Sequence, residues 1–177
     1  LLASLANMTV GGISWSTGPE TTIYMTRPLS RGSVLINSTS ILAPPLIDYG
    51  ALRDPTDLQM LLAIYLKNRQ LMAQPDLAVL GPIETSPAPN VTDEVEIAER
   101  IRKVLTPTAA HQCCTAAMVA RDEGGVVDPV NRVYGVEGVS VVDASFWPIV
   151  VGNGPQASVY AGAERAADLI KDRHGLL

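Results

Sequence analysis

The sequence predicts an α/β chain that serves two layers or two domains. Three observations lead to this prediction: β-rich runs at 20–26 and 33–37, helical patterns over 55–73 and 92–105, and an apolar run at 139–142 that precedes a terminal helix. The apolar run lacks alternation, which is typical of a strand buried on both faces. We therefore expect one part at about 1–108 and a second at about 109–177.

Composition bounds the class of protein. The 177 residues are 47% hydrophobic and 18% charged, which is enough apolar material for a globular core. The net charge of −5 and the absence of a Lys/Arg cluster argue against nucleic acid or an anionic membrane as a partner. No apolar run approaches the roughly 18 residues that a membrane span needs. The composition favours a small neutral or cationic ligand.

The ends and the sequons predict the cellular context. The chain begins Leu1-Leu2-Ala3 without an initiator Met, so we expect an internal cut in a longer polypeptide. Three N-glycosylation sequons start at Asn7, Asn37 and Asn90, and they predict a secreted protein or one on the secretory route.

Cys113 and Cys114 are adjacent and cannot join distant segments. We expect them to act as small apolar side chains near the site and not as a disulfide framework.

The first half carries strand and helix signals in turn. The runs 20–26 and 33–37 flank the turn-forming segment 27–32, which predicts two paired antiparallel strands. Asp54-Pro55 predicts the start of a helix over 55–73. Thr92 is the predicted cap of a second helix, which Pro107 ends.

The second half carries the predicted site. Val139–Val142 is expected to be a buried strand that ends at Asp143-Ala144, and ligands bind at such ends. A terminal helix is predicted over Gln156–Asp172 with Gly175 as its C-cap, so that its N-terminus points toward 152–155. No G-x-G-x-x-G follows a strand, so this chain alone is not expected to bind a dinucleotide.

His111 is the candidate general base, because a neutral imidazole can accept a proton from a substrate at working pH. The other histidine, His174, lies among the last residues. A single histidine also fits a structural role, and the residue type alone leaves both interpretations open. Asp143 and Ala144 stand at the end of the predicted strand, where backbone N–H groups and a short carboxylate can hold a ligand, or Asp143 can simply cap the strand end in an Asx turn.

Several motifs in the second half resemble the C-terminal signature of the glucose-methanol-choline (GMC) oxidoreductases. They follow in the family's order and separations: H-Q-C-C-T-A-A-M from His111, G-V-V-D-P from Gly125, R-V-Y-G-V from Arg132, V-V-D-A-S from Val141 and A-E-R-A-A-D from Ala163. The segment 27–32 also resembles the family's P-x-S-R-G turn, and the resemblance covers roughly 25–173.

The resemblance implies a fragment of a larger GMC fold. Residues 1–108 would belong to an α+β substrate-binding domain, and 109–177 would carry the catalytic histidine and complete a Rossmann-like FAD-binding domain. It also implies an FAD cofactor, no metal, and oxidation of a small-molecule alcohol by hydride transfer to the flavin, with His111 as base. Asp143 and Ala144 would then hold the ribityl chain or phosphates of the flavin. The partner would be the N-terminal FAD-binding portion of the same polypeptide, present as a separate chain.

The resemblance also implies a cofactor contact at the start of the terminal helix. In this segment the sequence departs from the family's pattern at one position. Gly154, Pro155 and Gln156 would lie against the flavin, where free N–H groups and the helix dipole stabilise negative charge. In the family a second His, or an Asn, stands eleven residues after the Asp of V-V-D-A-S. This chain has Gly154 there, and Asn153 lies one residue early.

Three explanations of this departure stay open: Asn153 reaches the substrate oxygen through an altered loop, His111 works alone, or redox turnover has been lost. The main prediction is FAD-dependent alcohol oxidation. A non-redox lyase or cyclase that retains FAD is the alternative, and a non-catalytic subunit is the second alternative.

Overall fold

The computed structural model describes residues 10–15, 19–108, 110–152 and 154–176. It divides the chain into two compact units, Leu1–Pro107 (unit 1) and Thr108–Leu177 (unit 2). Each unit is described by itself. The predicted mixture of helices and strands is confirmed, and none of the described helices is long and apolar enough to cross a membrane.

The longest helix of unit 1 is α2 (Pro55–Met72), as the sequence predicts. Asp54 caps it, because its Oδ1 accepts a hydrogen bond from the N–H of Thr56 at 2.8 Å. Pro55 stands in the first turn, where a missing N–H leaves no helical hydrogen bond unmade. A short helix, α3 (Pro75–Ala78), follows directly.

The second long helix of unit 1 is α4 (Glu94–Val104), and its predicted cap is wrong by one residue. Asp93, not Thr92, is the N-cap, because the Asp93 carboxylate accepts the N–H of Glu96 at 2.8 Å. The helix ends at Val104, since Leu105 has an extended ψ of 123° two residues before Pro107.

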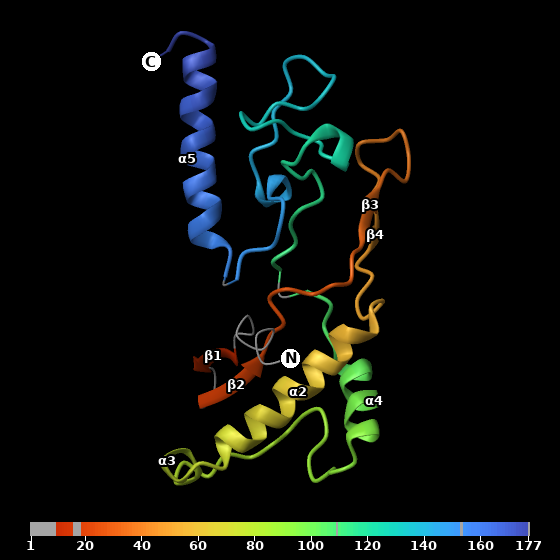
Figure 1. Ribbon diagram of the computed structural model, residues 1–177, viewed down its shortest axis with the longest axis vertical. Helices are drawn as coiled ribbons and strands as arrows, with labels where there is room; N and C mark the ends of the chain where they lie inside the picture. Colours follow the sequence, from red (N-terminus) through yellow and green to blue (C-terminus); the bar gives the residue numbers. More distant parts are fainter. Residues whose placement is uncertain (1–9, 16–18, 109, 153, 177) are drawn as a thin grey trace. The chain divides into compact units, whose positions relative to one another are not determined.

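Helices α2 and α4 pack together and enclose the core of unit 1 (Figure 1). One face of α2 contributes side chains at helical spacing, and α4 contributes two more. The buried cluster consists of Leu58, Leu61, Ile64, Tyr65, Ala88, Ile97 and Ile101.

A charged network ties α2 to the loop between α3 and α4. Arg69 Nε lies 2.8 Å from Glu84 Oε2, and Arg69 also donates to the carbonyls of Val91 and Ala88, each at 2.7 Å. Burial alone would raise the pKa of Glu84, but hydrogen bonds from Arg69 and Tyr65 outweigh it and hold that pKa below its ordinary value. Burial and the hydrogen bond to Glu84 raise the pKa of Tyr65 to about 12.

The strands of unit 1 do not pair as the sequence predicts. Strand β2 (Pro19–Ile23) pairs with β1 (Val10–Trp15), and β3 (Ser33–Leu35) pairs with β4 (Leu46–Asp48), both antiparallel. The predicted pairing of 20–26 with 33–37 is therefore wrong. The segment between those two runs is not a hairpin turn, because it is held by the first turn of α2.

That segment is fixed by hydrogen bonds to the first turn of α2 and within itself. Asp57 of α2 is 0% exposed and accepts the backbone N–H groups of Leu29 and Ser30 at 2.7 and 2.9 Å. The Ser30 hydroxyl accepts the N–H of Asp54 at 2.9 Å. Arg31 folds back onto the carbonyls of 28–30, so its guanidinium serves the turn. After this segment the chain forms β3, β4 and their connection, residues 33–48, before it reaches α2.

Unit 2 contains one long helix, α5 (Gln156–Arg173), and two single 3-10 turns, η1 (Arg121–Glu123) and η2 (Ala144–Phe146). The predicted terminal helix is confirmed. It ends in a Schellman motif: Gly175 has φ +65°, and the N–H of Leu176 donates to the carbonyl of Lys171 at 2.9 Å.

The predicted strand at Val139–Val142 is not present as a strand in the described chain. Its segment forms an isolated bridge between Ser140 and Arg132, and the N–H of Val141 donates to the Asn131 carbonyl at 3.0 Å. Val139 is 46% exposed. A buried strand needs paired neighbours and cover on both faces, and the described residues of this unit supply one short neighbour.

Candidate active site

The segment that carries His111 lies beside η2 and is joined to it by backbone hydrogen bonds. The N–H groups of Cys114, Ala116 and Met118 donate to the carbonyls of 144, 145 and 146 at 3.2, 2.8 and 2.7 Å. This ladder brings the motif that starts at His111 beside the motif that contains Asp143. Two segments separated by about thirty residues in the sequence are thus one structural element of the site.

Backbone conformation shapes the segment on both sides of His111. Ala110 has φ +60° and Cys114 has φ +72°, a region that side chains with a Cβ rarely adopt. The backbone N–H of His111 donates to Thr108 Oγ1 at 3.3 Å, and the residue is exposed. Strain of this kind persists only where the surroundings impose it, and it is common at functional sites.

The cysteines occupy the middle of this segment. Cys113 and Cys114 are both half-buried, and neither forms a disulfide. They are less buried than apolar core side chains would be, and their predicted place beside the site stays a prediction. Among the residues that the structure describes, no group of three His, Cys, Asp or Glu side chains is arranged to hold a metal ion.

Asp143 and Ala144 begin η2. Asp143 Oδ1 accepts hydrogen bonds from the N–H of Ser145, at 2.8 Å, and from the Ser145 hydroxyl. The carboxylate therefore caps the turn, as expected for an Asx turn at this position. The Ala144 carbonyl accepts from Cys114. Both residues therefore hold the backbone beside the His111 segment, and their predicted flavin contact stays a prediction.

Gly154, Pro155 and Gln156 lead into α5. Pro155 is the N-cap and offers no side-chain acceptor, and no acidic residue stands in the first turn. Gly154 is exposed, and a Cβ built on it would meet no atom within 4 Å. Neither space nor an unusual φ therefore requires a glycine there. Asn153 lies outside the described residues.

Asn131 is a buried residue of this unit to which the sequence assigned no role. It is 2% exposed with φ +65°, and its Nδ2 donates to the carbonyl of Val141 at 2.9 Å. It stands two residues after the Pro of G-V-V-D-P, and Asp128 of that motif accepts the N–H groups of Val130 and Arg132. Burial alone would raise the pKa of Asp128, but these hydrogen bonds lower it. In the sequence, the turn-forming pattern D-P-x-N from Asp128 to Asn131 is the signal that could have indicated this structural role.

A cavity of about 480 Å³ lies in unit 2 between the end of the His111 segment and α5. Met118, Phe146, Trp147 and Arg165 are among the residues that line it. The rings of Phe146 and Trp147 meet edge to face with centroids 6.3 Å apart, and Trp147 is 8% exposed. Phe146 and Trp147 thus line the cavity and also pack against each other within unit 2.

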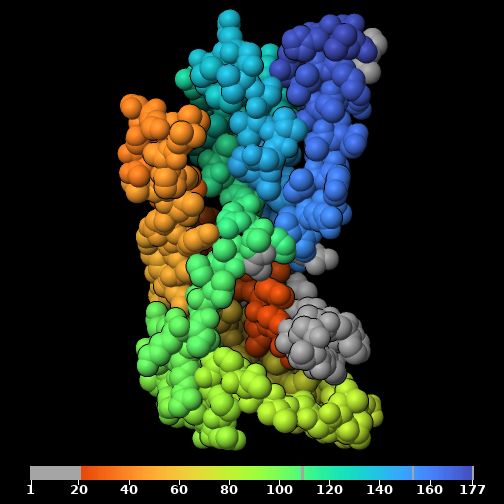
Figure 2. All heavy atoms as spheres, turned by 180° about the vertical axis from the view of Figure 1, so that it is seen from behind, coloured from red at the N-terminus to blue at the C-terminus, as the bar shows by residue number. Residues whose placement is uncertain are grey.

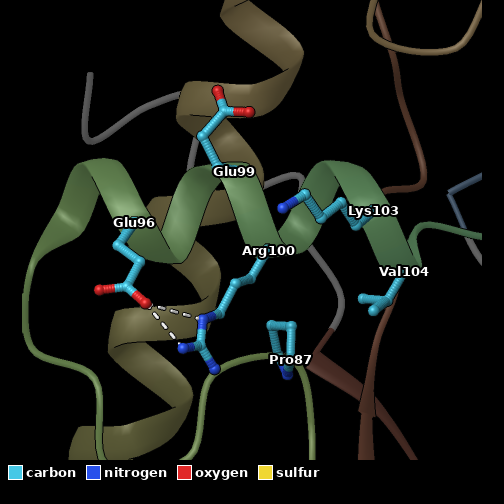
Figure 3. A pocket seen from close by; sticks show the side chains of 6 residues that line it. All are labelled: Pro87, Glu96, Glu99, Arg100, Lys103 and Val104. Atoms are coloured by element: carbon cyan, nitrogen blue, oxygen red, sulfur yellow. Dashed lines mark hydrogen bonds and ion pairs between the residues drawn. The ribbon is translucent and has the colours of Figure 1, made fainter.

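Another hollow, of about 370 Å³, lies on α4 in unit 1. In Figure 3 the Arg100 side chain reaches toward Glu96, to which it is bound at 2.6 Å, while Glu99 points away from that pair. The remaining lining residues are Pro87, Lys103 and Val104. None of the predicted site residues lines this hollow.

Comparison with known proteins places the chain in a family. The GMC oxidoreductase family profile matches residues 28–163. The dehydrogenase xptC of Emericella nidulans is 45% identical over 97% of this chain, and versicolorin B synthase of Aspergillus parasiticus is 37% identical over 79%. The chain spans only 28% and 22% of those two relatives.

Solved structures agree with the family match. An FAD-dependent oxidoreductase from Chaetomium thermophilum superposes with a TM-score of 0.86 at 46% identity, over 93% of this chain and 28% of that one. A fungal aryl-alcohol oxidase superposes with a TM-score of 0.78 at 38% identity, over 86% of this chain and 25% of that one. FAD, the predicted cofactor, is the cofactor named for the first of these structures. The chain belongs to the GMC oxidoreductase family.

Proposed function

We propose that the chain is part of an FAD-dependent enzyme that oxidises an alcohol, with His111 accepting the hydroxyl proton. The observation that carries the proposal is the ladder from 114–118 to 144–146, because it holds the His111 segment against the segment of Asp143 and Ala144. The relatives named as a dehydrogenase and an aryl-alcohol oxidase support the reaction class.

The start of α5 fits the anionic edge of a flavin. Helices α2 and α4 begin with carboxylate caps and acidic first turns, whereas Pro155 gives α5 no side-chain cap and its first turn has no acid. The first N–H groups of an uncapped helix and its positive dipole end attract negative charge. Pro155 and Gln156 would hold the cofactor there, and Gly154 leaves room beside it.

His111 carries the proton chemistry of the proposal. When bound, FAD would supply the acceptor for the hydride that leaves the carbinol carbon. The imidazole of His111 takes the hydroxyl proton as that hydride leaves, and a positioned base of this kind contributes about 10²–10⁴ in rate. Gly154 offers no second polar contact to the substrate oxygen, and the loss of one such contact costs about 2–4 kcal/mol of transition-state stabilisation.

A non-redox lyase or cyclase is the second candidate. Gly154 favours it, because the position at which the family places a second His or Asn has no side chain, and three of the relatives are named synthases. In that case FAD would be retained without hydride transfer.

The test is anaerobic reduction of the flavin in the full-length polypeptide. We expect primary aromatic alcohols to bleach the flavin absorbance and His111→Ala to slow this by about 10²–10⁴ with unchanged FAD content. His174→Ala is the matched control, since His174 is exposed at the end of α5. Product without bleaching would establish the lyase or cyclase, and an unchanged rate in His111→Ala would support a non-catalytic role.

We also propose a secretory route. Two sequon asparagines, Asn37 and Asn90, are exposed in unit 1, so an oligosaccharide can reach them in this chain. Asn7 lies outside the described residues. Glycopeptide mapping of protein from the native host tests this proposal.

A further inference from the structure

Asn131 holds the stretch of chain that leads into η2. Its side-chain Nδ2 donates to the carbonyl of Val141 at 2.9 Å, and its own carbonyl accepts the N–H of Val141 at 3.0 Å. Asn131 therefore binds both backbone groups of Val141, which stands two residues before Asp143. Asn131 is 2% exposed within this chain, so the chain by itself already supplies its surroundings.

The backbone of Asn131 places its amide beside that carbonyl. Asn131 has φ +65°, a region in which asparagine is several-fold enriched among residues other than glycine. The turn that sets this conformation starts at Asp128, whose carbonyl accepts the N–H of Asn131 at 2.9 Å. Because the N–H of Asn131 is used within the turn, its side chain supplies the donor for the carbonyl of Val141.

The His111 segment is bound on two sides. The ladder joins the N–H groups of 114–118 to η2. In addition, the carbonyl of Ala117, which the ladder does not use, accepts the N–H groups of Val126 and Val127 at 2.9 and 3.4 Å. The His111 segment is therefore held by the chain before the Asn131 turn as well as by η2.

Asn131 connects these two sides. Across the turn that contains it, the N–H of Asp128 donates to the carbonyl of Arg132 at 2.9 Å, which joins 126–132 into one unit. The amide of Asn131 then binds that unit to Val141. Three segments thereby form a closed ring in which each is hydrogen-bonded to the other two: 114–118, 126–132 and 141–146.

Helix α5 is attached to the same turn. Arg165 donates to the carbonyl of Pro129 at 3.3 Å, and Arg173 donates to that of Val130 at 3.1 Å. Arg173 also donates to Ser140 Oγ at 3.2 Å. Figure 2 shows α5, in blue, against the cyan part of unit 2. The Asn131 turn is thus a place where α5 and the ring of segments meet.

We infer that Asn131 is a positioning residue of the proposed site, an inference that deepens the proposed function and rests on it. Through the ring, its amide fixes the His111 segment relative to η2 and to the helix whose start would hold the flavin. A base must lie close to the proton that it accepts, and a displacement of about 1 Å can slow a reaction about 10²-fold. Asn131 would act through the backbone and not on the substrate.

Asn131→Gly tests the inference, because glycine adopts a positive φ without steric cost and the change removes the amide. The measurement is anaerobic stopped-flow reduction of the full-length protein with benzyl alcohol as the probe. We expect the limiting rate constant to fall about 10–10²-fold, with the half-saturating alcohol concentration within about threefold of the wild type. Loss of folded protein would lower the amplitude of this reaction and leave its rate constant unchanged.

Hydrogen exchange provides a readout that needs no turnover. In the FAD-loaded protein without substrate, Asn131→Gly should raise the exchange of the ladder amides of 114–118 about tenfold or more. Tyr134→Phe is the matched control, because it also removes one side-chain hydrogen bond to a carbonyl of unit 2, from the Tyr134 hydroxyl to Val119 at 3.3 Å. Val119 lies outside the ring, so the control should change neither the exchange nor the rate constant.

The outcomes separate this inference from the proposed function. A slower rate constant together with faster ladder exchange, in Asn131→Gly and not in Tyr134→Phe, supports the positioning role. Wild-type behaviour of Asn131→Gly in either measurement, or equal effects of the two variants, would overturn it. If no alcohol reduces the wild-type flavin, the proposed function fails, and ladder exchange alone decides whether Asn131 positions the His111 segment.

A second variant covers a failure of the glycine variant to fold. Asn131→Asp keeps the size of the side chain but has no N–H to donate to Val141, and it should give the same two effects. Loss of FAD binding in both Asn131 variants would make Asn131 a determinant of folding and would overturn the positioning role.

Discussion

The carboxylate of Asp57, in the buried first turn of α2, accepts the backbone N–H of Ser30 at 2.9 Å. Its other oxygen accepts the N–H of Leu29 at 2.7 Å. We expect Asp57→Ala to lower the free energy of unfolding by about 2–4 kcal/mol, because two partly buried donors lose their acceptor. Urea denaturation measures this. Asp57→Asn keeps one acceptor oxygen and should cost less, and equal losses in the two variants would contradict the assignment.

The pair of Glu84 and Arg69 should make stability depend on pH. The pKa of Glu84 is lowered in the folded chain, so its contribution is complete above the unfolded pKa of about 4.3 and is lost as the pH falls through the folded pKa. We expect Glu84→Gln to be about 1–2 kcal/mol less stable at pH 7. Denaturation between pH 7 and pH 3 should show this difference shrinking below about pH 4, and a constant difference would contradict the prediction.

The close approach of α5 to η2 should make Gly162 intolerant of larger side chains. A Cβ at Gly162 would lie 2.9 Å from Cζ of Phe146. We expect Gly162→Val to lower the unfolding free energy by about 1–3 kcal/mol through overpacking. Phe146→Leu should relieve part of that cost, so the double variant would be more stable than the sum of the single changes predicts. Strict additivity in thermal unfolding would argue against the contact.

Gly154 should accept the side chain that the family places there. Because a Cβ meets no atom within 4 Å, Gly154→His and Gly154→Asn are expected to fold normally. If the site oxidises alcohols, a second polar contact should raise the rate of flavin reduction by about 10²-fold. Gly154→Ala fills the same space without a polar group and should give no gain. Stopped-flow reduction distinguishes these variants.

The helices were predictable from the sequence because their signals are local. Asp54 and Pro55 start α2, and Gly175 ends α5, through interactions within a few residues. The strands were not predictable in the same way. Whether 33–35 pairs with 20–26 or with 46–48 depends on Asp57, which lies 27 residues beyond Ser30 in the sequence.

The site was partly predictable. The motifs nominated His111, Asp143 and Gly154 as candidates, but they did not reveal the ladder that joins 114–118 to 144–146, because backbone hydrogen bonds leave no mark on residue type. The run 139–142 has the composition of a buried strand, yet a strand is defined by its neighbours. Only one short neighbour is present among the described residues of unit 2.

The ladder has a consequence for how this protein can vary. It fixes both ends of the excursion 119–143, so the position of the His111 segment does not depend on the length of that excursion. Glu137 and Gly138 form an exposed turn on it, with φ +75° at Gly138 and no atom within 4 Å of a Cβ there. Insertions at that turn can leave the His111 segment in its place, which makes the turn a suitable point for grafting a longer loop.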